Sequence, residues 1–305
     1  MSKIDSLQPD PTAIGEVSDP PFARLPDPST LFKIRAERFQ ALAAQHPLAP
    51  FLLFLAGLSS CQHALQEGLP DGDLPSDEER QRARTHAMPP LGAGRFTFDA
   101  AFEATLERLL RMAADIEMPA AARAALTRVS EADAAARTAM ARAVLANEIP
   151  VEEVAGHVFV AAALQVHYAR LAAGLDAKQL VPVGDGVCPA CGGTPVSSMV
   201  VGWQGAHGAR FCVCSVCATQ WNYVRIKCTL CSSVEGISYQ EIEGGDGTLW
   251  GETCESCHGY AKILHQHKNP GLDPVADDVA SLALDILLRE NGYRRGSVNP
   301  FLLGY

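Results

Sequence analysis

The chain has 305 residues, 48% of them hydrophobic and 20% charged, which is enough for two globular domains and atypical of disordered proteins. Its formal net charge of −10 argues against nucleic-acid binding, which needs a basic surface. The strongest apolar run, 50–58, is far shorter than a membrane span, and the N-terminus lacks an apolar signal core. We therefore expect a cytoplasmic protein without direct membrane insertion.

Residues 1–28 are rich in proline and acidic side chains, and they predict a flexible leader. An all-α domain of five or six helices is expected to follow over residues 29–180. Ser29 or Thr30 is expected to cap the first helix, because short hydroxyl side chains favour that position. Pro47 is expected to end it.

The rest of this domain alternates helical patterns with one long polar stretch. Residues 67–95 are rich in glycine, proline and charge, and they predict a loop. Apolar or alanine-rich periodicity predicts the other helices, which cover 48–66, a segment from Thr97 to Leu110, 119–129, 131–147 and a segment from Pro150 to Leu171.

At about Val181 the composition changes, as Gly, Ser, Thr, Val and Cys replace Ala, Leu and Arg. Alternating runs at 219–226 and 260–266 predict strands. Acidic residues at 277 and 278 are expected to open a final helix. One face of this helix is predicted to carry Val279, Leu282, Ala283 and Ile286. The apolar tail 297–305 is expected to dock on the rest of the protein.

Eight of the ten cysteines form four Cys-x-x-Cys pairs that repeat after 40 residues. The first module contains Cys188/Cys191 and Cys214/Cys217, and the second contains Cys228/Cys231 and Cys254/Cys257. Two thiolates of one tight turn can face the same ion, and two such turns complete a tetrahedral shell. Each module therefore predicts one four-cysteine metal site in a zinc-ribbon or rubredoxin-like unit.

The expected fold class is α+β, with an all-α domain followed by two tandem four-cysteine metal modules and a C-terminal helix. The boundaries predicted for the last three parts are 181–227 for the first module, 228–270 for the second, and 271–305 for the helix and tail. The duplication favours ligand pairing within each module and two independent units. A tetrahedral set of four sulfurs suits both zinc and iron, and either ion could simply replace a small hydrophobic core.

The residue after each second cysteine is expected to be small, because backbone N–H groups approach the sulfurs there. Three positions agree with this, namely Gly192, Ala218 and Ser232. The fourth is His258, so we expect the last turn of the second module to be less regular.

The remaining metal-binding residue types favour ordinary structural roles. Cys212 is expected to be a bystander, because the position 40 residues later is Glu252. Cys61 is expected to be a buried core thiol. His265 and His267 are expected on a solvated strand face. No nucleophile elbow, phosphate-binding loop or dinucleotide fingerprint occurs, so no catalytic residue is predicted and the chain is not expected to be an enzyme.

Several short motifs, in order along the chain, resemble those of the formate dehydrogenase accessory protein (FdhE) family. They are Pro28-Ser-Thr-Leu31, Cys188-Pro-Ala-Cys191-Gly, Pro195-Val-Ser-Ser-Met199, Cys214-Ser-Val-Cys217-Ala-Thr-Gln-Trp221, Val224-Arg-Ile-Lys-Cys228, Glu255-Ser-Cys257, Val275-Ala-Asp-Asp-Val-Ala-Ser-Leu282 and Asn299-Pro-Phe301. The resemblance covers most of the chain after the leader.

The resemblance implies a cytoplasmic maturation factor that binds the catalytic subunit of respiratory, molybdenum-containing formate dehydrogenase. It also implies rubredoxin-like iron at all eight paired cysteines, with zinc as the alternative ion. Two other functions stay open, a rubredoxin-like electron-transfer protein and a zinc-ribbon docking platform without redox chemistry. The sequence leaves open whether the chain forms a homo-oligomer.

Overall fold

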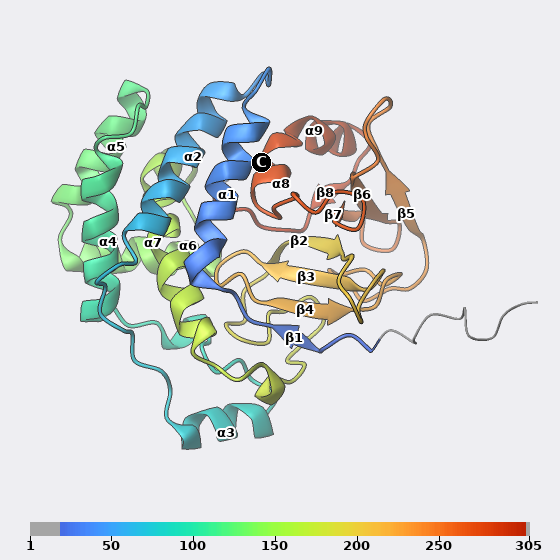
Figure 1. The fold of residues 1–305 in the computed structure, drawn as a ribbon, viewed down its shortest axis with the longest axis horizontal. Helices are drawn as coiled ribbons and strands as arrows, with labels where there is room; N and C mark the ends of the chain where they lie inside the picture. The colour runs from blue at the N-terminus through green and yellow to red at the C-terminus, as the bar shows by residue number, and fades with distance from the viewer. Residues whose placement is uncertain (1–18, 303–305) are drawn as a thin grey trace, which may run out of the picture.

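The computed structural model describes residues 19–302, in which a group of helices packs beside one continuous β-sheet (Figure 1). The helices within residues 28–173 make up the helical domain. They are α1 (Pro28–Leu42), α2 (Ala49–Ala64), α3 (Asp77–Thr85), α4 (Ala100–Ala113), α5 (Ala120–Glu131), α6 (Ala134–Ala146) and α7 (Val154–Ala173), with single 3-10 turns at Ala93–Arg95, Val151–Glu153 and Ala177–Gln179.

Helix α7 is the centre of the helical domain. Fifteen of its 20 residues are buried, and it packs against α1, α2, α4, α5 and α6. A helix that is apolar nearly all round must be covered on every side, which explains this central place. The predicted helix is confirmed, and its buried surface is wider than the single stripe expected from the sequence.

The start of α1 corrects the predicted cap. The helix begins at Pro28, and the Oδ1 atom of Asp27 accepts a hydrogen bond from the backbone N–H of Ser29 at 3.0 Å. Asp27 is therefore the N-cap, and neither Ser29 nor Thr30 takes that role. Proline suits the first helical position because its missing N–H would have no partner there.

The predicted loop 67–95 is wrong in its middle, where α3 forms. Ser76 and Glu79 make a reciprocal capping box: the Glu79 N–H donates to Ser76 Oγ at 3.3 Å and the Ser76 N–H donates to Glu79 Oε2 at 2.9 Å. This Ser-x-x-Glu pattern is a helix-start signal in the sequence. The charge of the segment concealed it.

Both ends of the described chain are ordered against the sheet. The short strand β1 (Ala23–Arg24) pairs with Trp221 and Gln220, so this part of the predicted flexible leader belongs to the sheet. Residues 1–18 of the predicted leader lie outside the described residues. The predicted docking of the tail is confirmed as far as residue 302, since Asn299, Phe301 and Leu302 are buried.

Within the described part of the chain the sheet has eight strands in the order β1-β4-β3-β2-β7-β6-β5, with β8 beside β7. The strands after β1 are β2 (Pro195–Val200), β3 (Arg210–Cys214), β4 (Gln220–Tyr223), β5 (Ile237–Gln240), β6 (Leu249–Cys254), β7 (Gly259–His265) and β8 (Arg294–Arg295). The predicted strands at 219–226 and 260–266 are confirmed as β4 and β7. The other strands of the modules had no clear alternating pattern.

The duplication seen in the cysteines extends to the strands. Within each module three antiparallel strands follow the first cysteine pair, as β2-β3-β4 in one module and β5-β6-β7 in the other, and the corresponding strands overlap after a shift of 40 residues. The modules are not independent, however. Strand β2 pairs in parallel with β7, from Ser198 opposite Ile263 to Val200 opposite His265, and this joins the two modules in one sheet.

A buried ion pair links the two modules across this junction, between β3 and β6. The guanidinium of Arg210 on β3 donates two hydrogen bonds of 2.9 Å to the carboxylate of Glu252 on β6. Arg210 also donates to the backbone carbonyl of Lys227, in the segment that connects the modules, at 3.2 Å. The side chains of Arg210 and Glu252 are 0% and 4% exposed. Bidentate pairs of this kind fix orientation as well as distance.

The C-terminal segment forms two helices in place of the single predicted one, α8 (Ala276–Ala280) and α9 (Leu282–Glu290), with a break at Ser281. The hydroxyl of Ser281 accepts a hydrogen bond from the buried Lys262 of β7 at 2.9 Å. The predicted apolar face is partly wrong: Leu284 and Leu288 are buried, whereas Ile286 is 47% exposed.

Lys262 belongs to a buried cluster of charges that fixes both C-terminal helices to β7. Its partners are Asp278 and Asp285, and both of these acids also pair with Arg295. Two positive and two negative side chains balance each other, as buried charges must.

No single helix in residues 19–302 is long and apolar enough to cross a membrane; α6 and the segment 151–173 reach the needed length only as a pair bent by 115°.

Candidate metal centres

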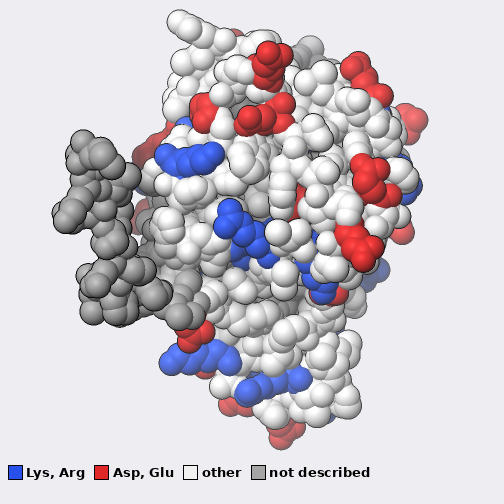
Figure 2. Space-filling view, turned by 90° about the vertical axis from the view of Figure 1, so that its right-hand side faces the viewer, with Lys and Arg blue, Asp and Glu red and all other residues white. Residues whose placement is uncertain are grey.

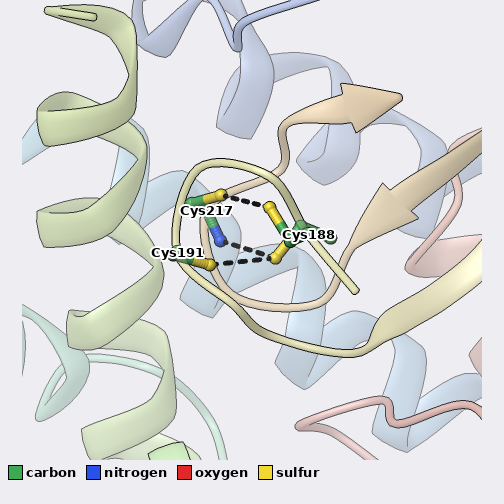
Figure 3. A group of neighbouring side chains, drawn as sticks. Cys188, Cys191 and Cys217 are labelled. Atoms are coloured by element: carbon green, nitrogen blue, oxygen red, sulfur yellow. Dashed lines mark hydrogen bonds between the residues drawn. The ribbon is translucent and has the colours of Figure 1, made fainter. Parts of the chain in front are cut away.

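The first module gathers the sulfurs of Cys188, Cys191, Cys214 and Cys217 within 4.8 Å of one another. The Cys188 and Cys217 sulfurs are 3.6 Å apart, and those of Cys191 and Cys214 are 3.4 Å apart. Figure 3 shows the labelled side chains converging from two loops, beside a helix in the colour of α7. We call this group the first centre.

The second module repeats the arrangement with Cys228, Cys231, Cys254 and Cys257, which we call the second centre. The Cys228 and Cys257 sulfurs are 3.8 Å apart, and those of Cys231 and Cys254 are 3.7 Å apart. The structure thus brings all eight predicted cysteines together in the pairing expected from the repeat. Within residues 19–302 these two groups are the only sets of three or more potential metal ligands whose ligand atoms lie close to one another.

The sulfur separations fit a tetrahedral metal ion. With metal–sulfur bonds of about 2.3 Å, a tetrahedron has edges of about 3.8 Å. Two of the six separations in each centre, of 3.4 to 3.8 Å, are close to this value, and the others lie within 4.8 Å. Each group of four therefore has the donor type, number and spacing that a zinc or iron ion requires, without large movement of the backbone.

Each of the four cysteine turns ends in a residue with a left-handed backbone. The φ angles are 79° at Gly192, 57° at Ala218, 65° at Ser232 and 51° at His258. This conformation is unfavourable for residues other than glycine, so its recurrence shows that the turns need it. The expectation of a less regular last turn is wrong for the backbone, because His258 adopts the same conformation as its equivalents.

Backbone N–H groups point at the sulfurs. The N–H groups of Val216 and Cys217 donate to the Cys214 sulfur at 3.4 and 3.5 Å, and the N–H of Leu230 donates to the Cys228 sulfur at 3.4 Å. Burial raises the pKa of Cys254, but hydrogen bonds from the N–H groups of Cys257 and Ser256 outweigh it and lower this pKa to about 7. Such bonds favour the thiolate, which is the form that binds metal.

In the first centre, burial has the largest effect on the pKa of one cysteine. Burial raises the pKa of Cys188 well above its usual value. A thiol buried in this way resists ionisation unless a cation compensates the charge, so a metal ion would supply what this centre needs.

The helical domain covers the first centre through two contacts that the sequence did not reveal. The N–H of Leu91, after α3, donates to the carbonyl of Ala190 at 2.8 Å. The side-chain amide of Gln165, on α7, donates to the carbonyl of Ser215 at 2.9 Å. A glutamine on an apolar helix is a weak signal for a contact of this kind, and nothing in the sequence near residue 91 indicates the other.

The remaining candidates lie outside both centres. Cys212 is buried and its sulfur is 3.8 Å from the hydroxyl of Ser198, and Cys61 is also buried, as expected for core thiols. The expectation for His265 is wrong, because this side chain is only 3% exposed. Its ring packs against Trp250 with the ring centroids 4.1 Å apart, whereas His267 is half-buried.

Burial and the nearby charge of Lys268 lower the pKa of His265 to about 4. The unfolded chain binds a proton at this histidine below pH ~6.5, whereas the folded protein does not until the pH approaches the lower value. The contribution of the uncharged His265 to the free energy of unfolding is therefore fully present above pH ~6.5 and is lost as the pH falls from there towards 4. The free energy of unfolding should decrease by about 1 to 2 kcal/mol between pH 7 and 5 for this reason.

Urea unfolding at the two pH values checks this prediction. The His265→Leu variant should show a smaller decrease in the free energy of unfolding than the unmodified chain. His86→Leu, at an exposed histidine of the helical domain, is the control and should keep the full decrease. Equal decreases in all three proteins would contradict the burial of an uncharged His265.

Comparison with known proteins finds matches to one family along most of the chain. Three family models match successive parts of the chain: "FdhE, N-terminal" over residues 20–185, "FdhE, central domain" over 187–225, and "FdhE, C-terminal domain" over 226–302. Together they span both the helical domain and the two modules.

Individual relatives match along nearly their whole length. A "Protein FdhE homolog" of Rhizobium meliloti (strain 1021) is 48% identical over 304 residues, which is 99% of both chains. A homologue from Pseudomonas aeruginosa is 38% identical and covers 89% of this chain and 90% of its own. The crystal structure of the FdhE protein from Pseudomonas aeruginosa superimposes with a TM-score of 0.83 at 36% identity, covering 93% of this chain and 99% of that one. The chain therefore belongs to the FdhE family.

Proposed function

We propose that the protein is an accessory factor for the maturation of formate dehydrogenase, acts in the cytoplasm, and binds the catalytic subunit of that enzyme. Its membership of the FdhE family along the full chain carries this proposal. On this account the protein has no catalytic activity of its own, and it works by binding its client.

The eight paired cysteines are proposed to hold two iron ions, one in each centre. The spacing of the sulfurs supports metal binding, and the resemblance of the cysteine motifs to those of the FdhE family supports iron over zinc. Iron in such a site would supply one-electron chemistry with little change in geometry, whereas zinc would be inert.

We place the contact with formate dehydrogenase on the second module and the connection that leads into it from the first. Of the 13 large hydrophobic residues that are exposed in the described part of the chain, six lie between residues 224 and 242. We call them the apolar segment: Val224, Ile226, Leu230, Val234, Tyr239 and Ile242. Exposed apolar side chains that gather in one region mark protein-binding surfaces.

The geometry of this region suits a protein partner. Strand β5 forms one edge of the sheet. The hydroxyl group of its Tyr239 donates a hydrogen bond to the carbonyl of Arg225 at 3.3 Å, which places β5 beside the connection between the modules. The side of the molecule that carries β5 faces the viewer in Figure 2, where uncharged surface separates scattered acidic and basic groups. An edge strand beside uncharged surface can accept a partner's backbone as well as its side chains.

The double variant Ile226→Glu/Val234→Glu should lose binding to the catalytic subunit, because two charges would be buried against an apolar partner surface. We expect recovery in a pull-down to fall at least about tenfold. Val151→Glu is the matched control: Val151 is 75% exposed on the helical domain and its replacement should leave binding unchanged.

The same variants can be tested in cells. A strain that lacks the protein should have little formate dehydrogenase activity, and the Val151→Glu form should restore it while the double variant should not. Normal formate dehydrogenase activity in the deletion strain would contradict the proposed function. Unchanged recovery of the double variant in the pull-down would contradict only the proposed surface.

Electron transfer is a second candidate, favoured by the exposure of Cys231 in the second centre. An iron–sulfur ligand at the surface shortens the path to an external electron donor. A reversible midpoint potential, together with a partner that reduces the iron, would support this function. Protein that binds only zinc in cells would exclude it and leave a docking platform.

A further inference from the structure

The two centres have equivalent ligands but differ in exposure. All four cysteines of the first centre are buried, whereas in the second centre Cys231 is exposed and Cys257 is half-buried. The difference is not one of sulfur geometry, because the separations are similar in both centres. It lies in what covers the ligands.

The residues between the paired cysteines show the same contrast. In the first module these spacer residues are buried or half-buried, namely Pro189, Ala190, Ser215 and Val216. In the second module three of the four are exposed, namely Leu230, Glu255 and Ser256. A donor group from outside can therefore approach the second centre along its spacers and cannot approach the first.

The cover of the first centre comes from the helical domain. Leu91 donates a hydrogen bond to the carbonyl of Ala190, and Gln165 donates one to the carbonyl of Ser215. Both cysteine turns of this centre are therefore hydrogen-bonded to residues outside the module. The positions 40 residues later are Leu230 and Glu255, and both are exposed. The duplicated modules thus differ because only one of them lies under α7.

We propose that the second centre is an exchange site, at which a thiolate or a chelating donor from outside replaces Cys231, while the first centre is closed. In this step Cys231 leaves the ion and takes a proton from water, and the incoming donor forms the new bond. The oxidation state of the ion does not change. The first centre can exchange only when the helical domain opens locally, which is slower.

This inference requires metal at both centres, and it does not depend on formate dehydrogenase as the partner. The full chain loaded with two zinc ions is mixed with the chromophoric chelator 4-(2-pyridylazo)resorcinol, and zinc release is followed over time. We expect two phases of one ion each, with the first at least about tenfold faster than the second. Release of both ions in one phase would overturn the exchange site and leave the proposed function intact.

Matched substitutions assign the phases. Cys191 and Cys231 are equivalent after a shift of 40 residues. Cys231→Ser should lose the fast phase and keep one slowly released ion, and Cys191→Ser should keep only a rapidly released one. A slow ion that disappears in Cys231→Ser would overturn the inference.

Alkylation of the unmodified, zinc-loaded chain gives a test that does not depend on the folding of variants. Iodoacetamide reacts with cysteines that leave their ion, and peptide mass spectrometry identifies them. Cys231 and Cys257 should be modified first, and Cys188 and Cys191 last. Modification of Cys188 as early as Cys231 would overturn the proposal.

Discussion

Replacing Arg210 with methionine is expected to lower the free energy of unfolding by about 3 to 5 kcal/mol, one of the largest effects of any single substitution in this chain. The change leaves the carboxylate of Glu252 buried without its partner, in a site where that side chain is 4% exposed. It also removes the bond to Lys227 in the connection between the modules. Urea denaturation measures the loss.

The double variant Arg210→Met/Glu252→Leu is the control, because it removes both charges together. Replacing a whole buried ion pair with apolar residues of similar size is often nearly neutral, so we expect a cost of about 1 kcal/mol or less. If the single variant lowers the free energy of unfolding by no more than the double variant does, the ion pair does not stabilise the contact between the two modules.

Cys188→Ser is expected to lower the thermal unfolding midpoint by at least about 10 °C, because it would remove one of the four proposed metal ligands from a centre on which the helical domain packs. The hydrogen bond from Gln165 of α7 to Ser215 makes the first centre part of the core of that domain. Circular dichroism at 222 nm, which reports mainly on helices, measures the midpoint.

Cys228→Ser is the matched control at the equivalent position of the second module. It should lower the midpoint by less than half as much, since three of the four spacer residues of that centre are exposed and the helical domain does not cover them. Equal shifts in the two variants would show that both centres contribute alike to the stability of the helices.

Local patterns predicted the parts of this fold that depend on neighbouring residues. The apolar periodicity of α7 and the alternation in β4 and β7 are local features, and so is the 40-residue repeat that groups the cysteines. The Ser76–Glu79 capping box was equally local, and it was missed only because the surrounding charge suggested a loop.

Other features depend on contacts between distant residues and could not be derived from pattern. The parallel pairing of β2 with β7 joins segments about 65 residues apart, and no alternation or turn signal encodes it. The break between α8 and α9 involves Ser281 and the buried Lys262, whose charge has partners only in the folded protein. The cover over the first centre depends on Leu91 and Gln165 in the same way.

We propose that eight cysteines of this FdhE family member hold two metal ions. Anaerobic purification, elemental analysis and a visible spectrum after ferricyanide oxidation would test this. We expect two iron ions per chain, one for each group of four sulfurs, with the thiolate-to-Fe(III) charge-transfer bands of a red iron centre with four sulfur ligands. Folded protein without metal, in which all eight thiols react freely with a thiol reagent, would contradict it.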